Sequence, residues 1–300
     1  MTIAILGAGG LIGRSLLPFL KGNAVISPSR SLLDLTDSLA VRHFMRIYKP
    51  KRVYFLAADV GGIDYNLKHP ATIFSNNLSM IHNVFSAAMY NKVEKMVFVG
   101  SSCMYPKHAP QPFLEEFLGH GDFEPSNYSY ALAKQVGVTM AKTFFDEYGL
   151  LTVCPILTNV YGLHDHFDEK AHVIPALVKK IFNAKKNSLP SITLRGTGRA
   201  KREFLFAEDA AKALKFCMET LTDPNPINVG SNFEYTIEEV AWLICDALGY
   251  TGDIVWGGED DGMLKKKLDI SKITALGFSE TVNLREGLKR VVNHYLEMKV

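Results

Sequence analysis

The sequence predicts an α/β protein in which a doubly wound parallel sheet is joined to a smaller, mixed α/β C-terminal lobe. Short β-rich runs alternate with amphipathic segments of helical spacing through the first half of the chain. The first run is followed at once by a glycine-rich segment, and after Asn159 the regular alternation is lost. Alternating strands and helices specify a parallel sheet covered on both faces, with ligands at the carboxyl ends of its strands.

The elements of the first half follow from residue type and period. β-rich runs predict strands at Thr2–Leu6, Ala24–Ser27, Arg52–Ala57, Lys95–Gly100 and Leu151–Leu157. Apolar residues at helical spacing predict helices at Leu11–Leu20, Leu39–Tyr48, Ile73–Tyr90 and Tyr130–Tyr148. Each helix connects two strands, as a parallel arrangement requires.

The second half predicts a less regular succession. We expect helices at Val173–Ala184, Ile237–Leu248 and Leu284–Met298, a strand at Ile192–Leu194, and a strand followed by a helix within Arg202–Thr220. Thr236 and Glu239 have capping-box spacing, and Glu208 and Asp209 are expected to cap the helix within Arg202–Thr220. We expect one domain of residues 1–162 with about 203–232, and a second lobe of about 163–202 with 233–300.

Composition limits the classes of partner. Of the 300 residues 47% are hydrophobic and 21% charged, which is typical of a globular protein. The net charge of +2 gives no overall attraction to nucleic acid or to an anionic membrane. No apolar stretch reaches the roughly 18 residues that span a bilayer, and no signal peptide opens the chain. We expect a cytoplasmic enzyme with no nucleic-acid or membrane partner.

The cysteines and histidines do not have the spacing of a metal site. The cysteines lie far apart, at Cys103, Cys154, Cys217 and Cys245. This pattern fits neither a disulfide framework nor a zinc site. His164 and His166 flank Asp165, but two histidines without further ligands more often mark a solvated loop. We therefore expect no metal.

A phosphate-binding loop is predicted directly after the first strand. Gly7, Gly10 and Gly13 form a GxxGxxG segment that opens a helix. Glycines permit a tight turn, close approach of a pyrophosphate to the backbone, and close packing of the helix on the strand. The helix amino terminus also favours negative charge. The position between a strand and a helix predicts a Rossmann dinucleotide site rather than a structural turn without ligand.

The end of the second strand predicts the choice of cofactor. An acidic residue there would bind the ribose 2′-hydroxyl of NAD, whereas arginine accommodates the 2′-phosphate of NADP. The sequence is Ser27-Pro-Ser-Arg30, with no carboxylate before Asp34. Hydroxyls and a guanidinium suit a phosphate, so we expect NADP(H). The alternative is that Arg30 is a solvated loop charge.

Tyr130 and Lys134 predict a proton donor. A spacing of four places the phenol and the ammonium on one helical face. A tyrosine with a pKa of about 10 is a weak acid at neutral pH, and we expect the neighbouring ammonium to lower the pKa of Tyr130. Ser101 ends the fourth strand and so lies at the ligand-binding edge. The glycine loop, Ser101, Tyr130 and Lys134 in this order resemble the catalytic set of the extended short-chain dehydrogenases.

Further segments resemble one family within that superfamily, the GDP-L-fucose synthases. These segments are Ala57-Ala-Asp-Val-Gly-Gly-Ile63, Gly100-Ser-Ser-Cys-Met-Tyr-Pro-Lys107, Glu124-Pro, Thr158-Asn-Val-Tyr-Gly162, His172-Val-Ile-Pro-Ala-Leu177 and Arg202-Glu-Phe-Leu205. The similarity runs from the first strand to about Phe206 and continues weakly to Lys266-Lys-Leu-Asp269. The segments around Cys103 and His172 are the most specific.

The resemblance implies a reaction. The family converts GDP-4-keto-6-deoxymannose to GDP-L-fucose by epimerising C3 and C5 and then reducing C4 with NADPH. By resemblance, Cys103 and His172 are the acid/base pair of the epimerisation. Tyr130 protonates the C4 oxygen, Ser101 orients it, and Lys134 also holds the nicotinamide ribose.

The resemblance also implies binding residues and an oligomeric state. The cofactor set is Gly7, Gly10, Leu11, Ile12, Gly13, Arg30, Asp34, Leu35, Ala57, Ala58, Lys134 and His172. The GDP-sugar set is Ser102, Cys103, Asn159, Lys180, Arg195, Arg202 and Lys266. A homodimer is implied through the helices at Ile73–Tyr90 and Tyr130–Tyr148.

Some positions depart from the family pattern and leave the substrate open. Asp59 stands where lysine is usual, Arg195 where an aromatic residue is expected, and Lys179 and Lys180 where arginine is usual. A GDP-4-keto-heptose or 6-deoxyheptose of a surface or capsule polysaccharide is an alternative substrate. A C4-reductase without epimerase activity is an alternative enzyme. A non-catalytic NADP-sensing protein is disfavoured, because a sensor need not keep its proton donor.

Overall fold

The structure is a computed structural model that describes residues 1–168, 170–258 and 262–299. The strands are β1 (Thr2–Leu6), β2 (Ala24–Ile26), β3 (Arg52–Phe55), β4 (Lys95–Phe98), β5 (Gly100–Ser101), β6 (Leu151–Leu157), β7 (Asn159–Tyr161), β8 (Ser191–Arg195), β9 (Lys201–Phe206), β10 (Pro226–Val229), β11 (Glu234–Thr236), β12 (Asp253–Gly257) and β13 (Lys265–Lys266). The α-helices are α1 (Leu11–Leu16), α2 (Ser38–Tyr48), α3 (Ile63–Lys68), α4 (Pro70–Tyr90), α5 (Tyr128–Tyr148), α6 (Val173–Lys186), α7 (Ala207–Thr220), α8 (Ile237–Leu248), α9 (Ser271–Ala275) and α10 (Leu284–Glu297). The 3₁₀ helices are η1 (Leu17–Leu20), η2 (Ser102–Met104), η3 (Glu115–Phe117) and η4 (Pro125–Asn127).

The order in which successive strands are added to the main sheet reverses at β1. Parallel pairing joins β1 to β2 on one side and to β3 on the other. The full order is β10–β6–β4–β3–β1–β2, with β5 alongside β6, and the pairings within it are parallel. Such a reversal opens a crevice at the carboxyl ends of the strands, where ligands bind. Gly7 follows β1 directly, so the glycine loop lies at this crevice.

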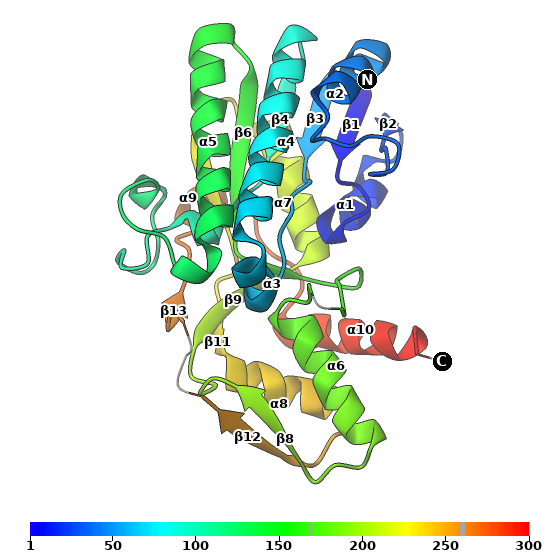
Figure 1. Ribbon diagram of the computed structural model, residues 1–300, viewed down its shortest axis with the longest axis vertical. Helices are drawn as coiled ribbons and strands as arrows, with labels where there is room; N and C mark the ends of the chain where they lie inside the picture. The colour runs from blue at the N-terminus through cyan, green and yellow to red at the C-terminus, as the bar shows by residue number, and fades with distance from the viewer. Residues whose placement is uncertain (169, 259–261, 300) are drawn as a thin grey trace.

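Helices cover both faces of the main sheet (Figure 1). α4 packs between α2 and α5 on one face, and α1 packs against α7 on the other. An apolar cluster lies beneath each layer: Phe85 and Phe98 belong to the first, and Leu16 and Leu214 to the second. The doubly wound arrangement expected from the alternation of strands and helices is confirmed.

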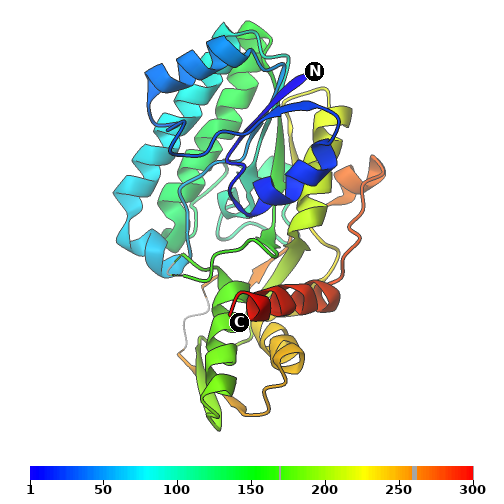
Figure 2. The ribbon, with the colours of Figure 1, turned by 90° about the vertical axis from the view of Figure 1, so that its right-hand side faces the viewer.

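The remaining elements form a smaller lobe at the other end of the molecule (Figures 1 and 2). α8 packs against both α6 and α10 around a third apolar cluster that includes Ile181, Ile244 and Val291. One small sheet has the order β11–β9–β13 with β7 also paired to β9, and a second contains β12 and β8. β9 leads directly into α7, so it connects this lobe to a helix layer of the main sheet.

Most expected elements are present, with small shifts at their ends. The strands expected in the first half correspond to β1, β2, β3, β4 and β6. The helix expected over Leu11–Leu20 is divided into α1 and η1, because Pro18 has no N–H with which to continue the α-helical pattern. Thr236 and Glu239 form the expected capping box. No helix within the described ranges has both the length and the apolar character needed to cross a membrane.

The expected capping of α7 is wrong. Phe206 occupies the N-cap position and its side chain makes no capping hydrogen bond. Asp209 is buried instead, and its carboxylate accepts hydrogen bonds of 2.8 Å from the backbone N–H groups of Thr281 and Val282. Lys212 donates to the same carboxylate at 3.0 Å. Asp209 therefore ties α7 to the segment that precedes α10.

Candidate active site

Ser101 lies at the carboxyl edge of the main sheet. β5 carries the chain beyond β4, and Ser101 there pairs with Leu157 of β6. The hydroxyl of Ser101 then accepts a hydrogen bond of 3.2 Å from the backbone N–H of Cys103, which fixes the turn of η2. Ser101 and Cys103 are half-buried, whereas Ser102 between them is buried. The turn thus presents the hydroxyl and the thiol at the same end of the sheet.

Lys134 is held by the close approach of α5 to the sheet. Gly137 permits this approach, because a Cβ there would lie 2.2 Å from the ring of Phe98. The Nζ of Lys134 lies 4.7 Å from the centroid of that ring and donates a hydrogen bond of 2.8 Å to the carbonyl of Val99. Burial lowers the pKa of Lys134 to about 8.

Tyr130 lies one turn from Lys134 on α5. The ammonium is 5.9 Å from the centroid of the Tyr130 ring, and the phenol shares a hydrogen bond with Ser101. The expectation that Lys134 lowers the pKa of Tyr130 is wrong for this structure. Burial raises the pKa of Tyr130, and negative charge on Cys103 raises it further. The phenol is therefore protonated at neutral pH, as a proton donor must be.

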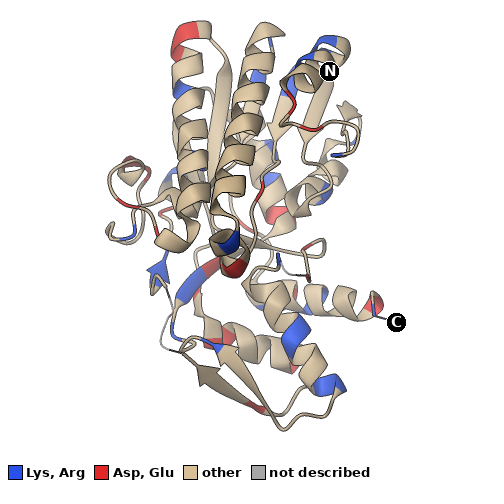
Figure 3. Ribbon diagram, viewed as in Figure 1, with Lys and Arg blue, Asp and Glu red and all other residues tan. Residues whose placement is uncertain are grey.

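Cys103 contacts a lysine from the small sheet of the second lobe. The Nζ of Lys266 donates a hydrogen bond of 3.4 Å to the sulfur of Cys103. Lys266 lies on β13, in register with Arg202 of β9, where Figure 3 shows basic residues on both strands. The resemblance placed Lys266 among the ligands of the GDP-sugar, whereas the structure directs its ammonium to the thiol.

His172 occupies the N-cap position of α6 and comes from the second lobe. The segment before His172 is held against the loop after β3, because the N–H of Gly62 donates a hydrogen bond of 3.2 Å to the carbonyl of Lys170. Partial loss of hydration among the surrounding protein atoms lowers the pKa of His172, and repulsion from His166 lowers it further. Much of the residue nevertheless stays exposed. In the described part of the chain, no hydrogen bond joins His172 to Cys103.

The glycine loop is shaped by its contacts with neighbouring backbone. Gly7 has a φ of +99°, and a Cβ there would lie 2.6 Å from the backbone nitrogen of Ala57. A Cβ on Gly13 would lie 2.4 Å from the carbonyl oxygen of Gly7. Gly9, by contrast, has no atom within 4 Å of such a Cβ. The loop is tightly packed against Ala57 at Gly7 and open at Gly9, as a phosphate-binding loop requires.

The segment after β2 presents Arg30 to solvent. Arg30 is exposed and lies between Ser29 and Ser31, whose hydroxyls are 2.8 Å apart. The carboxylate of Asp34 accepts hydrogen bonds from the backbone and hydroxyl of Thr36, and these bonds lower the pKa of Asp34. Leu35 is buried. The first acidic side chain after β2 is therefore engaged in its own turn.

The residues expected to hold the nucleotide sugar lie on several elements. Asn159, on β7, donates a hydrogen bond of 2.9 Å to the carbonyl of Glu203 on the neighbouring strand. Arg202 is half-buried on β9, and Lys180 is exposed on α6. Asn159 and Arg202 thus lie on two paired strands, whereas Lys180 lies on a helix of the second lobe.

Arg195, at the end of β8, pairs with a residue of α3. Its guanidinium lies 2.9 Å from the carboxylate of Asp64. The side chains are 57% and 75% exposed, so solvent screens this ion pair strongly. Arg195, expected to bind the GDP-sugar, is thus placed against the start of α3.

A family model named NAD dependent epimerase/dehydratase matches residues 3–230, which include the glycine loop, Ser101, Tyr130 and Lys134. The chain belongs to this family. Membership of the epimerase/dehydratase family assigns the chain a nicotinamide cofactor.

Individual relatives of this chain are nucleotide-sugar enzymes. A GDP-L-fucose synthase of Sinorhizobium fredii is 37% identical, and the match covers 96% of this chain and 93% of that protein. A GDP-L-colitose synthase of Yersinia pseudotuberculosis is 34% identical, with 100% and 99% covered. The solved structure of a GDP-mannoheptose C4 reductase from Campylobacter jejuni with NADP bound has a TM-score of 0.89 at 29% identity, and the match covers 98% of each chain. The resemblance to GDP-L-fucose synthases is confirmed.

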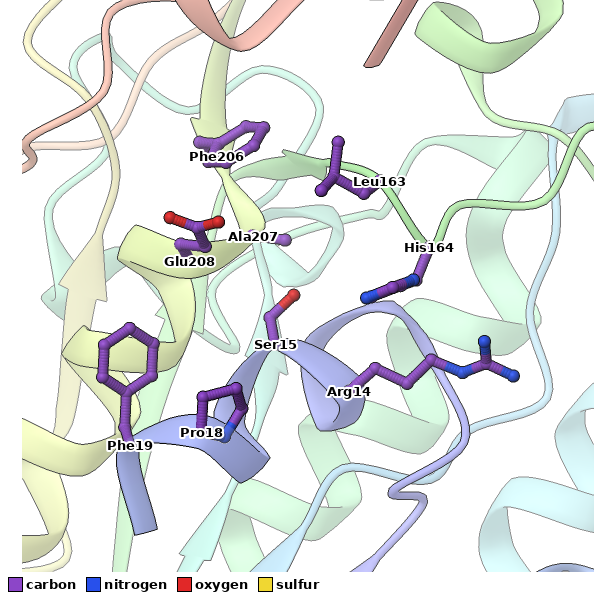
Figure 4. Close-up of a pocket in the computed structure, with 9 residues that line it drawn as sticks. All are labelled: Arg14, Ser15, Pro18, Phe19, Leu163, His164, Phe206, Ala207 and Glu208. Carbon is purple, nitrogen blue, oxygen red and sulfur yellow. The ribbon is translucent and has the colours of Figure 1, made fainter. Parts of the chain in front are cut away.

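A small cavity of about 150 Å³ lies between α1, η1, the start of α7 and the loop that contains His164 (Figure 4). It is lined by Arg14, Ser15, Pro18, Phe19, Leu163, His164, Phe206, Ala207 and Glu208. Arg14 also donates a hydrogen bond of 2.9 Å to the carbonyl of Gly9, which places the cavity beside the glycine loop. Its lining contains none of the residues expected to act in catalysis.

Sequence reasoning overlooked Glu203, which is 0% exposed on β9. One carboxyl oxygen accepts a hydrogen bond of 2.7 Å from the backbone N–H of Leu268, and the other has no hydrogen-bond partner among the described residues. Burial raises the pKa of Glu203 to about 8. The available signal was an acidic residue directly before the apolar run Phe204-Leu-Phe206 of this strand.

Proposed function

We propose that this enzyme reduces the C4 ketone of a GDP-4-keto sugar with NADPH, after epimerisation at C3 and C5. The observation that supports it best is the juxtaposition of Ser101, Tyr130 and Lys134 with the thiol of Cys103 at one edge of the sheet. Plain ketone reduction uses the first three residues. A thiol beside them adds a group that can move a proton to or from carbon.

The glycine loop fits a dinucleotide. Its inner side tolerates no Cβ at Gly7 or Gly13, while its outer side is open at Gly9. Gly10, Leu11 and Ile12 would hold the pyrophosphate at the start of α1, with Ala57 and Ala58 beside it. When bound, the reduced nicotinamide supplies the hydride for C4. Residues 1–162 with about 203–232 form the proposed cofactor domain, and the rest forms the nucleotide-sugar lobe.

Arg30 supports NADP(H) rather than NAD(H). It is exposed beside serine hydroxyls, and a guanidinium pairs well with a phosphate. Asp34, the nearest acidic side chain, accepts hydrogen bonds from Thr36 within its own turn. The 2′-phosphate of NADP would thus meet a positive charge without an opposing free carboxylate.

Tyr130 would donate its proton to the C4 oxygen of the sugar. The raised pKa of Tyr130 keeps that proton on the phenol at neutral pH until the oxygen becomes basic. Ser101, hydrogen-bonded to the phenol, would orient the ketone. Lys134, fixed by Val99, would stabilise the phenolate that remains.

Cys103 and His172 would exchange protons at C3 and C5. A C4 ketone acidifies the hydrogen on each neighbouring carbon, so a base can remove it and leave an enolate. The lowered pKa of His172 keeps the imidazole largely neutral near pH 7, able to give or take a proton. The two residues come from different lobes, which suits attack on opposite faces of a ring held between them.

The bound sugar nucleotide is proposed to contact Asn159, Lys180, Arg195 and Arg202, with guanine as the base. Similarity to both GDP-hexose and GDP-heptose enzymes leaves a heptose as a second candidate substrate. Similarity to a C4 reductase leaves reduction without epimerisation as a second candidate activity. We also propose a homodimer through α4 and α5, which pack side by side.

The test is to supply GDP-4-keto-hexoses and GDP-4-keto-heptoses in deuterated water with and without NADPH. We expect deuterium at C3 or C5 without NADPH, and oxidation of NADPH with at least one sugar of the panel. Reduction without exchange would replace the proposal with a C4-reductase. No oxidation of NADPH with any GDP-4-keto sugar would contradict it altogether.

A further inference from the structure

Lys266 has little access to solvent and faces the thiol of Cys103. It is 8% exposed, and its Nζ donates a hydrogen bond of 3.4 Å to the Cys103 sulfur. Removing an ammonium from water is costly unless a polar or charged group compensates. Among the described residues, the hydrogen-bond partner of the Lys266 ammonium is the Cys103 sulfur.

The position of Lys266 is fixed by its strand. On one side β13 pairs with β9. On the other side Gln111 bonds the backbone both before and after Lys266: it donates 3.1 Å to the carbonyl of Lys265 and accepts 2.8 Å from the N–H of Lys267. Phe113 adds a backbone hydrogen bond of 2.7 Å to Lys267. The strand that carries Lys266 is therefore held on both sides, and it positions the ammonium beside the thiol.

The neighbouring lysines point elsewhere. Side chains alternate between the two faces of a strand, so Lys265 and Lys267 share the face opposite Lys266. They lie 3.4 Å and 3.9 Å from the carboxylate of Glu234, and they are 46% and 30% exposed. Figure 3 shows the positive charge of this region on β13 and β9. Only the middle lysine of the three contacts a group of the proposed reaction centre.

We propose that Lys266 is the charge-stabilising partner of Cys103 in proton exchange with the sugar, a role that rests on the proposed function. As the C–H bond beside the ketone breaks, its proton joins the Cys103 sulfur and the electron pair moves to the C4 oxygen. The thiolate before this step, and again after the proton leaves, carries a negative charge. The Lys266 ammonium stabilises that charge without itself losing a proton.

The first test uses the thiol alone and needs no sugar. The rate at which iodoacetamide alkylates Cys103 is measured against pH in wild type, Lys266→Met, Lys266→Arg and Lys265→Met. Cys154, Cys217 and Cys245 are buried, and Cys103→Ser measures any reaction at them.

Loss of the ammonium should move the midpoint of the alkylation profile to higher pH by about one unit or more. Lys266→Arg, which keeps the charge, should stay near wild type, as should the control Lys265→Met. Equal profiles for Lys266→Met and wild type, in variants with unchanged circular dichroism, would overturn the proposal. A shift of the same size in Lys265→Met would also overturn it.

The second test separates the two chemical steps. Lys266→Met should lower deuterium wash-in at C3 and C5 by about tenfold or more relative to its effect on the reduction of an already epimerised ketone. An equal rise in KM for both steps with an unmoved alkylation profile would mean that Lys266 only binds the sugar nucleotide, and would refute the proposal. If wild type shows no wash-in, the epimerase part of the proposed function fails, and the alkylation profiles still decide whether Lys266 stabilises the thiolate.

Discussion

The ammonium of Lys170 lies 3.7 Å from the carboxylate of Asp59 and 4.3 Å from the centroid of the Tyr65 ring. The same carboxylate accepts hydrogen bonds of 3.2 Å from the hydroxyl of Tyr65 and 2.8 Å from the amide of Asn76. Asp59 replaces the lysine usual in the resembled family, and its negative charge is matched within this network. Because Lys170 precedes His172 by two residues, the network joins the loop after β3 to the start of α6.

A double-mutant cycle should therefore show coupling between Asp59 and Lys170. We expect Asp59→Asn and Lys170→Met each to lower the free energy of unfolding, with a coupling energy on the order of 1 kcal/mol in urea titrations. Asp64 and Arg195 form the matched control, since solvent screens that exposed pair, and its coupling should be near zero. Additive effects of Asp59→Asn and Lys170→Met would contradict the expectation.

The parts of the structure that could be predicted are those set by local sequence. The period of the apolar residues determines the strands and helices of the main sheet, and a spacing of four determines that Tyr130 and Lys134 share a helical face. The glycine loop follows from the same kind of argument, because a turn between a strand and a helix is a local feature. The division of Leu11–Leu20 at Pro18 could also have been predicted from the missing N–H.

The remaining parts depend on contacts between distant segments. Lys266 and Cys103 are 163 residues apart, and β13 is too short to have a recognisable period. The pKa of Tyr130 is raised mainly by burial, which cannot be inferred from the spacing of Tyr130 and Lys134. Asp209 suited a helix cap by its position, but distant backbone N–H groups compete for its carboxylate.

Tyr130→Phe should slow ketone reduction by about 10²–10⁴-fold, the usual contribution of a positioned general acid. The glycine loop and Lys134 are unchanged, so binding of NADPH, measured by fluorescence titration, should persist. Turnover near the wild-type rate would mean that another group protonates the C4 oxygen.

Arg30→Ala should weaken binding of NADPH and leave binding of NADH almost unchanged. The guanidinium is exposed after β2, where it would meet only the 2′-phosphate that distinguishes the two cofactors. The measurement is kcat/KM for each cofactor with the same ketone. Equal efficiencies in the wild type would contradict the assignment of NADP(H).

Arg195→Ala should raise the KM for the GDP-sugar with little change in the melting temperature, because its ion pair with Asp64 is screened by solvent. Asp64→Asn should have the opposite effect on KM, since it frees the guanidinium for the ligand. If neither variant changes KM, Arg195 serves only the contact between β8 and α3.

Glu203→Gln should change how stability depends on pH. The carboxyl is buried on β9, and its pKa is raised from 4.5 to about 8. Below pH 4.5 the group is protonated in both the folded and the unfolded chain, so the stability associated with its protonated form is fully present there. As pH rises from about 4.5 to about 8, the unfolded chain releases the proton and the folded chain keeps it, so the free energy of unfolding falls.

The slope from this single group cannot exceed about 1.4 kcal/mol per pH unit. Gln cannot ionise, and its carbonyl can still accept the hydrogen bond from Leu268. We therefore expect Glu203→Gln to be no more stable than wild type at pH 5, and to gain on wild type steadily up to pH 8 in urea unfolding series. Asp209→Asn is the contrasting variant, because hydrogen bonds lower the pKa of Asp209. Loss of this carboxylate should lower the free energy of unfolding at neutral pH. Parallel stability curves for wild type and Glu203→Gln would show that the Glu203 carboxyl is ionised in the folded protein, against the burial that surrounds it.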